Sequence, residues 1–362
     1  MLILQTAING AFVILERSEE SRHLEILRSA QDDICSRAKY NPNVGVGLAL
    51  ISTRVMTESN MEKLLLAVII VFAFGTMAIA NDIAFYVGGV QPGVYDQKTM
   101  TNDVNKIINN TRAMFNDIQK FDDTDLFRFG RWVDANTGDG QFDIIWLNGH
   151  IPSTLYPTFN KAPDGSRAEK WLDDGNMFIN VADWFAWATY EKGFKERNTH
   201  TGAANILDLP ANIIVQAPDT RMKKTAAGRR FIPSLQDPYI SDRPVYLGAL
   251  ADPWVAVAFA ESSGKVRVDA GDKEGEMIPA GLLVDPVVLH NTKTDGYLAI
   301  ISQSTLENMG DRGAMCSEFI KNWVSREMGL LPVEPAGKLA TTWGSIKEPK
   351  NYVVPDGKYV TR

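Results

Sequence analysis

Two titratable side chains, His150 and Asp183, stand directly after short apolar runs in the middle of the chain. The runs read FDIIWLNGH and NMFINVAD, and Gly, Asn and Asp bound them. Their content of Ile, Phe, Trp and Val predicts strands buried on both faces of a sheet. An aspartate on the sharp turn after a strand can act as a covalent nucleophile. One interpretation is therefore a hydrolase that uses Asp183 and His150, with or without a metal ion.

Both residues also have simpler interpretations. Asp183 can cap a following helix by accepting its first N–H groups, which contributes about 1 kcal/mol and needs no further partner. A single histidine at a strand end is commonly a hydrogen-bonded part of the structure. His200 and His290 do not form an i,i+4 or H-x-H pair with His150, so the histidines lack the spacing of a metal site. The sequence predicts no metal and no cofactor, and it favours the capping role for Asp183.

A ligand-binding edge is predicted where the carboxyl ends of the strands meet, because ligands of open α/β sheets collect there. His150 and Asp183 could face one another across this crevice and bind a polar ligand. The residues that we place at this edge as ligand-binding candidates are Gly89, Gln91, Asn148, His150, Asp183 and Trp184.

Aromatic residues are dense near the same strand ends. They are Trp132, Tyr156, Trp184, Phe185 and Trp187. Flat rings beside Asp, Asn and Gln suit a carbohydrate, whose C–H face stacks while its hydroxyls form hydrogen bonds. We expect Trp184 to be the exposed ring, whereas Phe185 and Trp187 favour packing between a helix and the sheet.

The elements that must position these residues alternate between strand and helix. The predicted order is a strand at 82–87, a helix at 102–118 capped by Thr101 or Asn102, a strand at 125–129, and then strand, short helix, strand and helix within 142–190. This order predicts an α/β fold with a three-layer, doubly wound, mostly parallel sheet and right-handed crossovers.

The second half of the chain is less regular. Residues 194–253 hold one predicted strand at 212–216 and a Pro-rich section, which we interpret as an insertion or lid over the surface. Strand-like runs at 254–259, 266–268, 286–289 and 296–302 alternate with turns and predict some antiparallel members. A helix at about 312–328 closes the domain, and the tail at 331–362 is predicted to be extended.

Two loops suggest ligands but do not complete a motif. The glycine-rich GGVQPG at 88–93 fits neither the dinucleotide fingerprint nor the P-loop. The loop DANTGDGQ at 134–141 resembles a calcium loop, but its twelfth position is Ile145 instead of an acidic residue. A solvated loop is the favoured interpretation of residues 134–141.

Three stretches together resemble the class I glutamine amidotransferase-like superfamily, a flavodoxin-like group that includes trehalose-utilisation-type domains. They are IAFYVGGVQPGVYD, FDIIWLNGHIP with AEKWLDDGNMFINVAD, and GYLAIISQSTLENMGDRGAMCSEFIKNWV, and they cover about 83–328. The resemblance implies a nucleophilic Cys on the turn after 177–181. Here that turn reads Val181-Ala182-Asp183-Trp184, without Cys or Ser, and Cys316 falls within the terminal helix. The resemblance therefore predicts a non-catalytic member that binds a small polar ligand, such as a carbohydrate, or a protein partner.

The N-terminal region has the layout of a secretory signal peptide at 61–80, with a charged start, an apolar run and a small-residue cleavage site. Residues 1–60 resemble translated intergenic sequence upstream of a misplaced bacterial start codon. We expect an exported bacterial protein, periplasmic or extracellular, without membrane contact after cleavage. The net charge of −7 gives no reason to expect nucleic acid. A structural surface-interaction module is a further interpretation.

Overall fold

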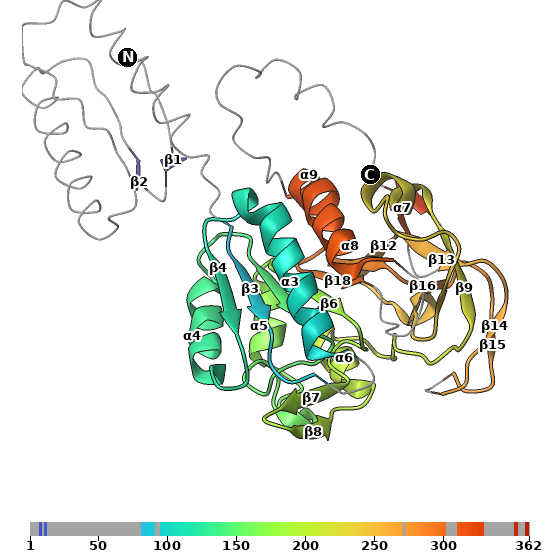
Figure 1. Cartoon of the computed structure of the whole chain (residues 1–362), viewed down its shortest axis with the longest axis horizontal. Coiled ribbons are helices and arrows are strands. Elements are labelled where there is room, and N and C mark those ends of the chain that lie inside the picture. The colour runs from blue at the N-terminus through green and yellow to red at the C-terminus, as the bar shows by residue number, and fades with distance from the viewer. Residues whose placement is uncertain are drawn as a thin grey trace, which may run out of the picture. The chain divides into compact units, whose positions relative to one another are not determined.

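The apolar runs predicted as buried strands form the parallel half of a nine-stranded mixed sheet (Figure 1). Five strands lie side by side in the order β4-β3-β5-β6-β18, and all neighbours among them are parallel. Their bounds are β3 (Ile83–Tyr86), β4 (Ile118–Phe121), β5 (Ile144–Leu147), β6 (Met177–Val181) and β18 (Tyr297–Ile301). Except for the edge strand β4, each is buried along its whole length. The predicted α/β class is confirmed at this level.

The other half of the sheet is antiparallel. Beyond β18 follow β17 (Val287–Asn291), β12 (Trp254–Ala258), β19 (Asn351–Val353) and β20 (Tyr359–Thr361). The predicted antiparallel strands of the C-terminal half are thus present, but the sheet is mixed and not mostly parallel. Short turns, such as the one that joins β17 to β18, connect antiparallel neighbours without a crossover helix.

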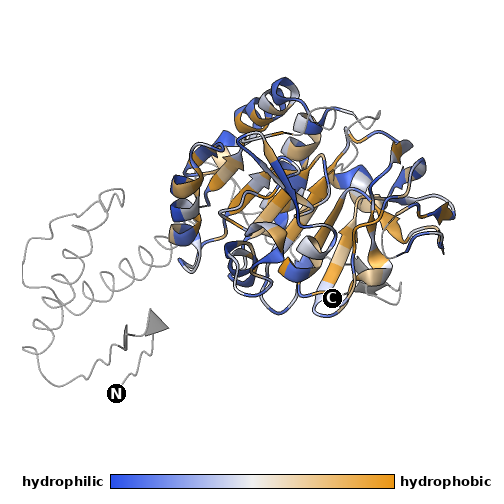
Figure 2. Cartoon of the chain, turned by 90° about the horizontal axis from the view of Figure 1, so that it is seen from below, coloured by the Kyte–Doolittle hydropathy of each residue, from blue (hydrophilic) through white to orange (hydrophobic). Residues whose placement is uncertain are grey.

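Helices cover both faces of the parallel half. One face packs against α3 (Gln97–Thr111) and α8 (Arg312–Phe319), which lie against each other, and the opposite face packs against α4 (Leu126–Asn136) and α5 (Arg167–Asp173) (Figure 1). Figure 2 shows the apolar strands inside and hydrophilic residues on the outer surfaces of the helices. The π-helical turn η4 (Ile320–Val324) and α9 (Ser325–Glu327) continue α8 and confirm the predicted terminal helix.

Two local predictions in the first half were wrong. The first helix begins earlier than expected, because the side chain of Asp96 caps it by accepting the N–H of Thr99 at 2.9 Å. The segment predicted as a strand at 125–129 is the start of α4, and the second strand is β4. Phe129 and Val133 are buried four residues apart on α4, so the apolar residues of this segment follow the period of a helix and not of a strand.

The region 194–253, interpreted from the sequence as an insertion or lid, holds regular elements. It contributes three strands to a second, five-stranded sheet with the order β10-β9-β13-β16-β11. The three strands from this region are β9 (Thr220–Lys224), β10 (Tyr239–Ser241) and β11 (Val245–Tyr246), and the other two are β13 (Ala260–Ser262) and β16 (Leu283–Val284). The predicted strand at 212–216 makes only single bridges, Ile214 with Val245 and Gln216 with Ala270.

Two hairpins and several short helical turns complete this part. The hairpins pair β7 (Ala188–Glu191) with β8 (Phe194–Arg197) and β14 (Val266–Arg267) with β15 (Met277–Ile278). The helical turns are η1 (Arg112–Met114), η2 (Thr158–Asn160), α6 (Thr201–Ile206), α7 (Ala226–Phe231) and η3 (Leu247–Ala249).

The computed structural model describes residues 81–90, 95–270, 273–301 and 310–328, with short strands at 7–8, 11–12, 351–353 and 359–361. The pair β1 (Ala7–Ile8) and β2 (Ala11–Phe12) belongs to a first unit, Met1–Gly75, and the remaining elements to a second, Thr76–Arg362. The predicted upstream segment, signal peptide and tail lie almost entirely outside the described residues. The ligand-binding candidate Gln91 also lies outside them. None of the helices in the described part of the chain combines the length and hydropathy needed to span a membrane.

Candidate functional site

A sharp turn follows β6 at the carboxyl edge of the sheet. Ala182 has a φ of 71°, in the left-handed region, and the N–H of Asp183 donates to the carbonyl of Val181 at 2.9 Å. No helix follows this turn directly. The chain turns again at Ala186, with a φ of 57°, and enters the β7–β8 hairpin. The predicted helix after this turn is wrong, and Asp183 does not cap one.

Asp183 is instead paired with a cation from a distant segment. Asp183 is 3% exposed, and its side chain accepts the N–H of Trp184 at 2.8 Å. Nη1 of Arg243, sixty residues later in the chain, donates to the same carboxylate. Burial raises the pKa of Asp183, and the positive charge of Arg243 opposes that rise. The carboxylate is therefore held by one backbone donor and one guanidinium.

His150 is buried beside this pair but does not bond to it. Its ring lies 5.6 Å from that of Tyr190, centroid to centroid, and neither ring nitrogen has a hydrogen-bond partner among the described residues. Burial lowers the pKa of His150 to about 3, and the charges of Lys195 and Arg243 add to the effect. The imidazole is neutral at physiological pH. The structure does not join His150 and Asp183 as the sequence hypothesis required.

Gly89 and Asn148 hold the edge together. The side-chain amide of Asn148 donates to the carbonyls of Gly88 at 3.1 Å and Gly89 at 3.3 Å. A Cβ on Gly89 would lie 2.6 Å from the carbonyl oxygen of Tyr190, so only glycine allows this approach. These two predicted ligand-binding residues are occupied by contacts within the protein.

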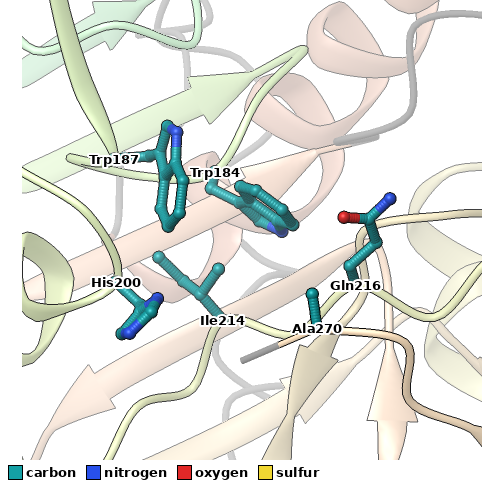
Figure 3. Close-up of a pocket in the computed structure, with 6 residues that line it drawn as sticks. All are labelled: Trp184, Trp187, His200, Ile214, Gln216 and Ala270. Carbon is teal, nitrogen blue, oxygen red and sulfur yellow. The ribbon is translucent and has the colours of Figure 1, made fainter. Parts of the chain in front are cut away.

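A cavity of about 240 Å³ lies beside the turn (Figure 3). It is lined by Trp184, Trp187, His200, Ile214, Gln216 and Ala270. The two indoles lie 4.8 Å apart between centroids at 57°, and the His200 ring is 5.6 Å from Trp187. A tight turn, in which the N–H of Trp187 donates to the carbonyl of Trp184 at 3.3 Å, brings both tryptophans to the same wall.

Gln216 contributes a polar side chain to the lining of this cavity. The Nε1 atom of Trp184 is buried and has no hydrogen-bond partner among the described residues. The carboxamide oxygen of Gln216 points toward the Trp184 indole (Figure 3). The backbone of Gln216 is fixed by Ala270, whose carbonyl accepts its N–H at 3.3 Å, and by the N–H of Asp269, which donates to its carbonyl at 2.8 Å. The cavity thus combines aromatic rings with an amide.

Comparison with known protein families, curated proteins and solved structures found no match to this chain. Two indole rings and one carboxamide line the cavity, and such a set of groups binds and orients a small molecule.

The predicted aromatic residues divide between this cavity and the core. Trp132 packs on Trp171, and Tyr156 and Phe185 are fully buried. Trp184 is 8% exposed, so it is a wall of the cavity and not the exposed ring we expected, whereas Trp187, expected in the core, also lines the cavity.

Four lining residues escaped sequence reasoning: His200, Ile214, Gln216 and Ala270. They lie outside the regular elements or at the start of one, so no periodicity marks them. Only the run of 212–216, predicted as a strand, hinted that this segment is buried and paired.

One group of acidic side chains lies elsewhere. Carboxylate oxygens of Asp164, Glu169 and Asp208 lie within 4.8 Å of one another. Glu169 already accepts the N–H groups of Gly165 and Ser166 as part of the capping box of α5. Its position is explained by that cap.

Proposed function

We propose that the chain is an exported, non-catalytic domain of the class I glutamine amidotransferase-like superfamily. In this proposal it binds a small polar ligand, a carbohydrate ring, in the cavity between Trp184, Trp187 and Gln216. The observation that carries the ligand class is the pair of indoles beside a carboxamide.

The order of the parallel strands supports the superfamily. Numbered along the chain from β3, the five parallel strands have the order 2-1-3-4-5, which is the order of flavodoxin-like sheets. Helices on both faces agree with a doubly wound, three-layer arrangement. The signal-like sequence at 61–80 supports export.

The turn after β6 supports a binding role. In the family that the sequence resembles, this turn presents the nucleophile, and here the strained position is Ala182, which has no reactive side chain. Asp183, next to it, is buried and paired with Arg243. A carboxylate held by a guanidinium and a backbone N–H is a weak nucleophile, because both partners stabilise its charge.

The cavity supports a small ligand with one flat apolar face. Its volume of about 240 Å³ lies below the roughly 300–1,000 Å³ of sites for drug-sized molecules. A single sugar ring can stack its C–H face on an indole while its hydroxyls meet the Gln216 carboxamide.

Binding of a monosaccharide panel to the full chain, measured by calorimetry and by tryptophan fluorescence, tests the proposal. We expect at least one sugar to bind saturably, Gln216→Ala to weaken it about tenfold, and Trp187→Ala to weaken it further. Phe127→Ala is the control, because Phe127 is 81% exposed on α4.

Two results would contradict the proposal. The first is the absence of saturable binding by any sugar at millimolar concentration. The second is turnover of the matching nitrophenyl glycosides or amides above the rate in buffer, since that would make the domain an enzyme.

A further inference from the structure

We infer that the ligand of this cavity is an anionic sugar and that Arg243 binds its oxyanion, a carboxylate or a phosphate. This inference rests on the proposed function and narrows its ligand class. It comes from the placement of Arg243, which the sequence did not single out.

Arg243 joins the cavity wall to the turn after β6. Its guanidinium carbon lies 4.8 Å from the centroid of the Trp184 ring, and that ring lines the cavity. Its Nη1 donates to Asp183, the one side chain among the described residues to which Arg243 is hydrogen-bonded. A guanidinium has five N–H donors in a planar fork. The remaining donors are therefore available to a group bound next to Trp184, and the side chain is 28% exposed.

Two cations lie within electrostatic range of the Asp183 carboxylate, Arg243 and Lys195 of β8. Lys195 also lies within electrostatic range of Arg243. Partly buried positive charges attract an anion more strongly than the same charges in open solvent, because screening is weaker there.

The chemistry of the fork selects oxyanions. Arginine binds carboxylates and phosphates through two parallel N–H···O bonds, and such charge-assisted bonds are about twice as strong as neutral ones. A sugar acid or sugar phosphate bound beside Trp184 would place its anionic group next to Arg243, which lies over that indole.

The test compares matched sugars on the full chain: glucose with glucuronate and glucose 6-phosphate, and galactose with galacturonate and galactose 6-phosphate. We expect at least one anionic form to bind about tenfold or more tightly than its neutral parent. The comparison of uronate with phosphate identifies the oxyanion. This preference should decrease as salt is added.

Two variants assign the preference to Arg243. Asp183→Asn removes the competing carboxylate, keeps an oxygen for the N–H of Trp184, and should raise the ratio of anionic to neutral affinity. Asp183→Asn with Arg243→Gln removes both charges together, so no buried charge is left unpaired, and should bring that ratio close to one.

The matched control is Asp125→Asn with Arg128→Gln. Arg128 pairs with Asp125 and lies over the ring of Phe121 at 5.1 Å, which repeats the arrangement of Arg243 on the surface of α4. This control should leave the affinity ratio at the wild-type value. Thermal melts of all variants verify that they are folded.

The outcomes separate the two proposals. If neutral sugars bind and their anionic forms bind no more tightly, the inference is wrong while the proposed function stands. The same conclusion holds if the double variant at Asp183 and Arg243 keeps the wild-type ratio. If no sugar of either kind binds, the proposed function itself fails.

Discussion

Acid should destabilise the folded chain through His150. Its side chain is 1% exposed, and burial lowers its pKa from 6.5 to about 3. As the pH falls below 6.5, the unfolded chain binds a proton that the folded chain refuses until about pH 3, so the free energy of unfolding decreases across this window. At about 1.4 kcal/mol for each pH unit, the loss reaches roughly 3 kcal/mol near pH 4.5.

The assay is urea unfolding of the wild type and of His150→Phe at about pH 7.5 and about pH 4.5. Phenylalanine keeps a planar ring against Tyr190 but does not titrate. The decrease in the free energy of unfolding between the two pH values should be smaller in the variant by roughly 3 kcal/mol. Comparing differences across pH removes the packing cost of the substitution, which is common to both conditions.

Tyr190→Phe is the control, because it alters the neighbouring ring without removing a group that titrates at acid pH. It should keep the wild-type pH dependence. The reasoning would be refuted if the wild type and His150→Phe lost the same free energy on acidification. In that case His150 would accept a proton within the folded protein, and its burial would not keep it neutral.

Three further substitutions test the turn and the amino edge of the sheet. Gly149 has a φ of 90°, and an added Cβ would lie 2.8 Å from the N–H nitrogen of Asp183, so Gly149→Ala should cost more than about 2 kcal/mol in urea unfolding. Gly193→Ala, where φ is 75° and the space is open, should cost only about 1 kcal/mol; equal losses would contradict the close approach. Burial raises the pKa of Asp143 from 3.8 to about 7, so its carboxylate destabilises the fold increasingly as pH rises through this interval. Asp143→Asn should therefore raise the melting temperature more at pH 8 than at pH 4, and an equal change at both pH values would count against this.

The candidate site was only partly visible in the sequence. Trp184 and Asp183 were placed at the right edge because the strand before them was recognisable. The role of Asp183 was not predicted, because its partner Arg243 comes from a segment that looked like a surface insertion. His150 was placed at the strand end, but its isolation from Asp183 depends on where the hairpin of Tyr190 packs.

The sequence by itself determined the buried strands. Short runs rich in Ile, Val, Phe and Trp favour strands buried inside a sheet, and β3, β5, β6, β12 and β18 all formed where such runs occur. The terminal helix followed in the same way from its apolar period. These are local properties, since burial and periodicity are written into neighbouring residues.

Only the tertiary structure decided the cavity. Its walls come from the turn at Trp184 and Trp187, from His200, from the segment of Ile214 and Gln216, and from Ala270, and single bridges such as Gln216 with Ala270 hold them together. Contacts between segments far apart in the chain depend on how sheets and loops pack, and no local pattern encodes them. For this reason the strand that leads to the site could be predicted, whereas the groups that face a ligand could not.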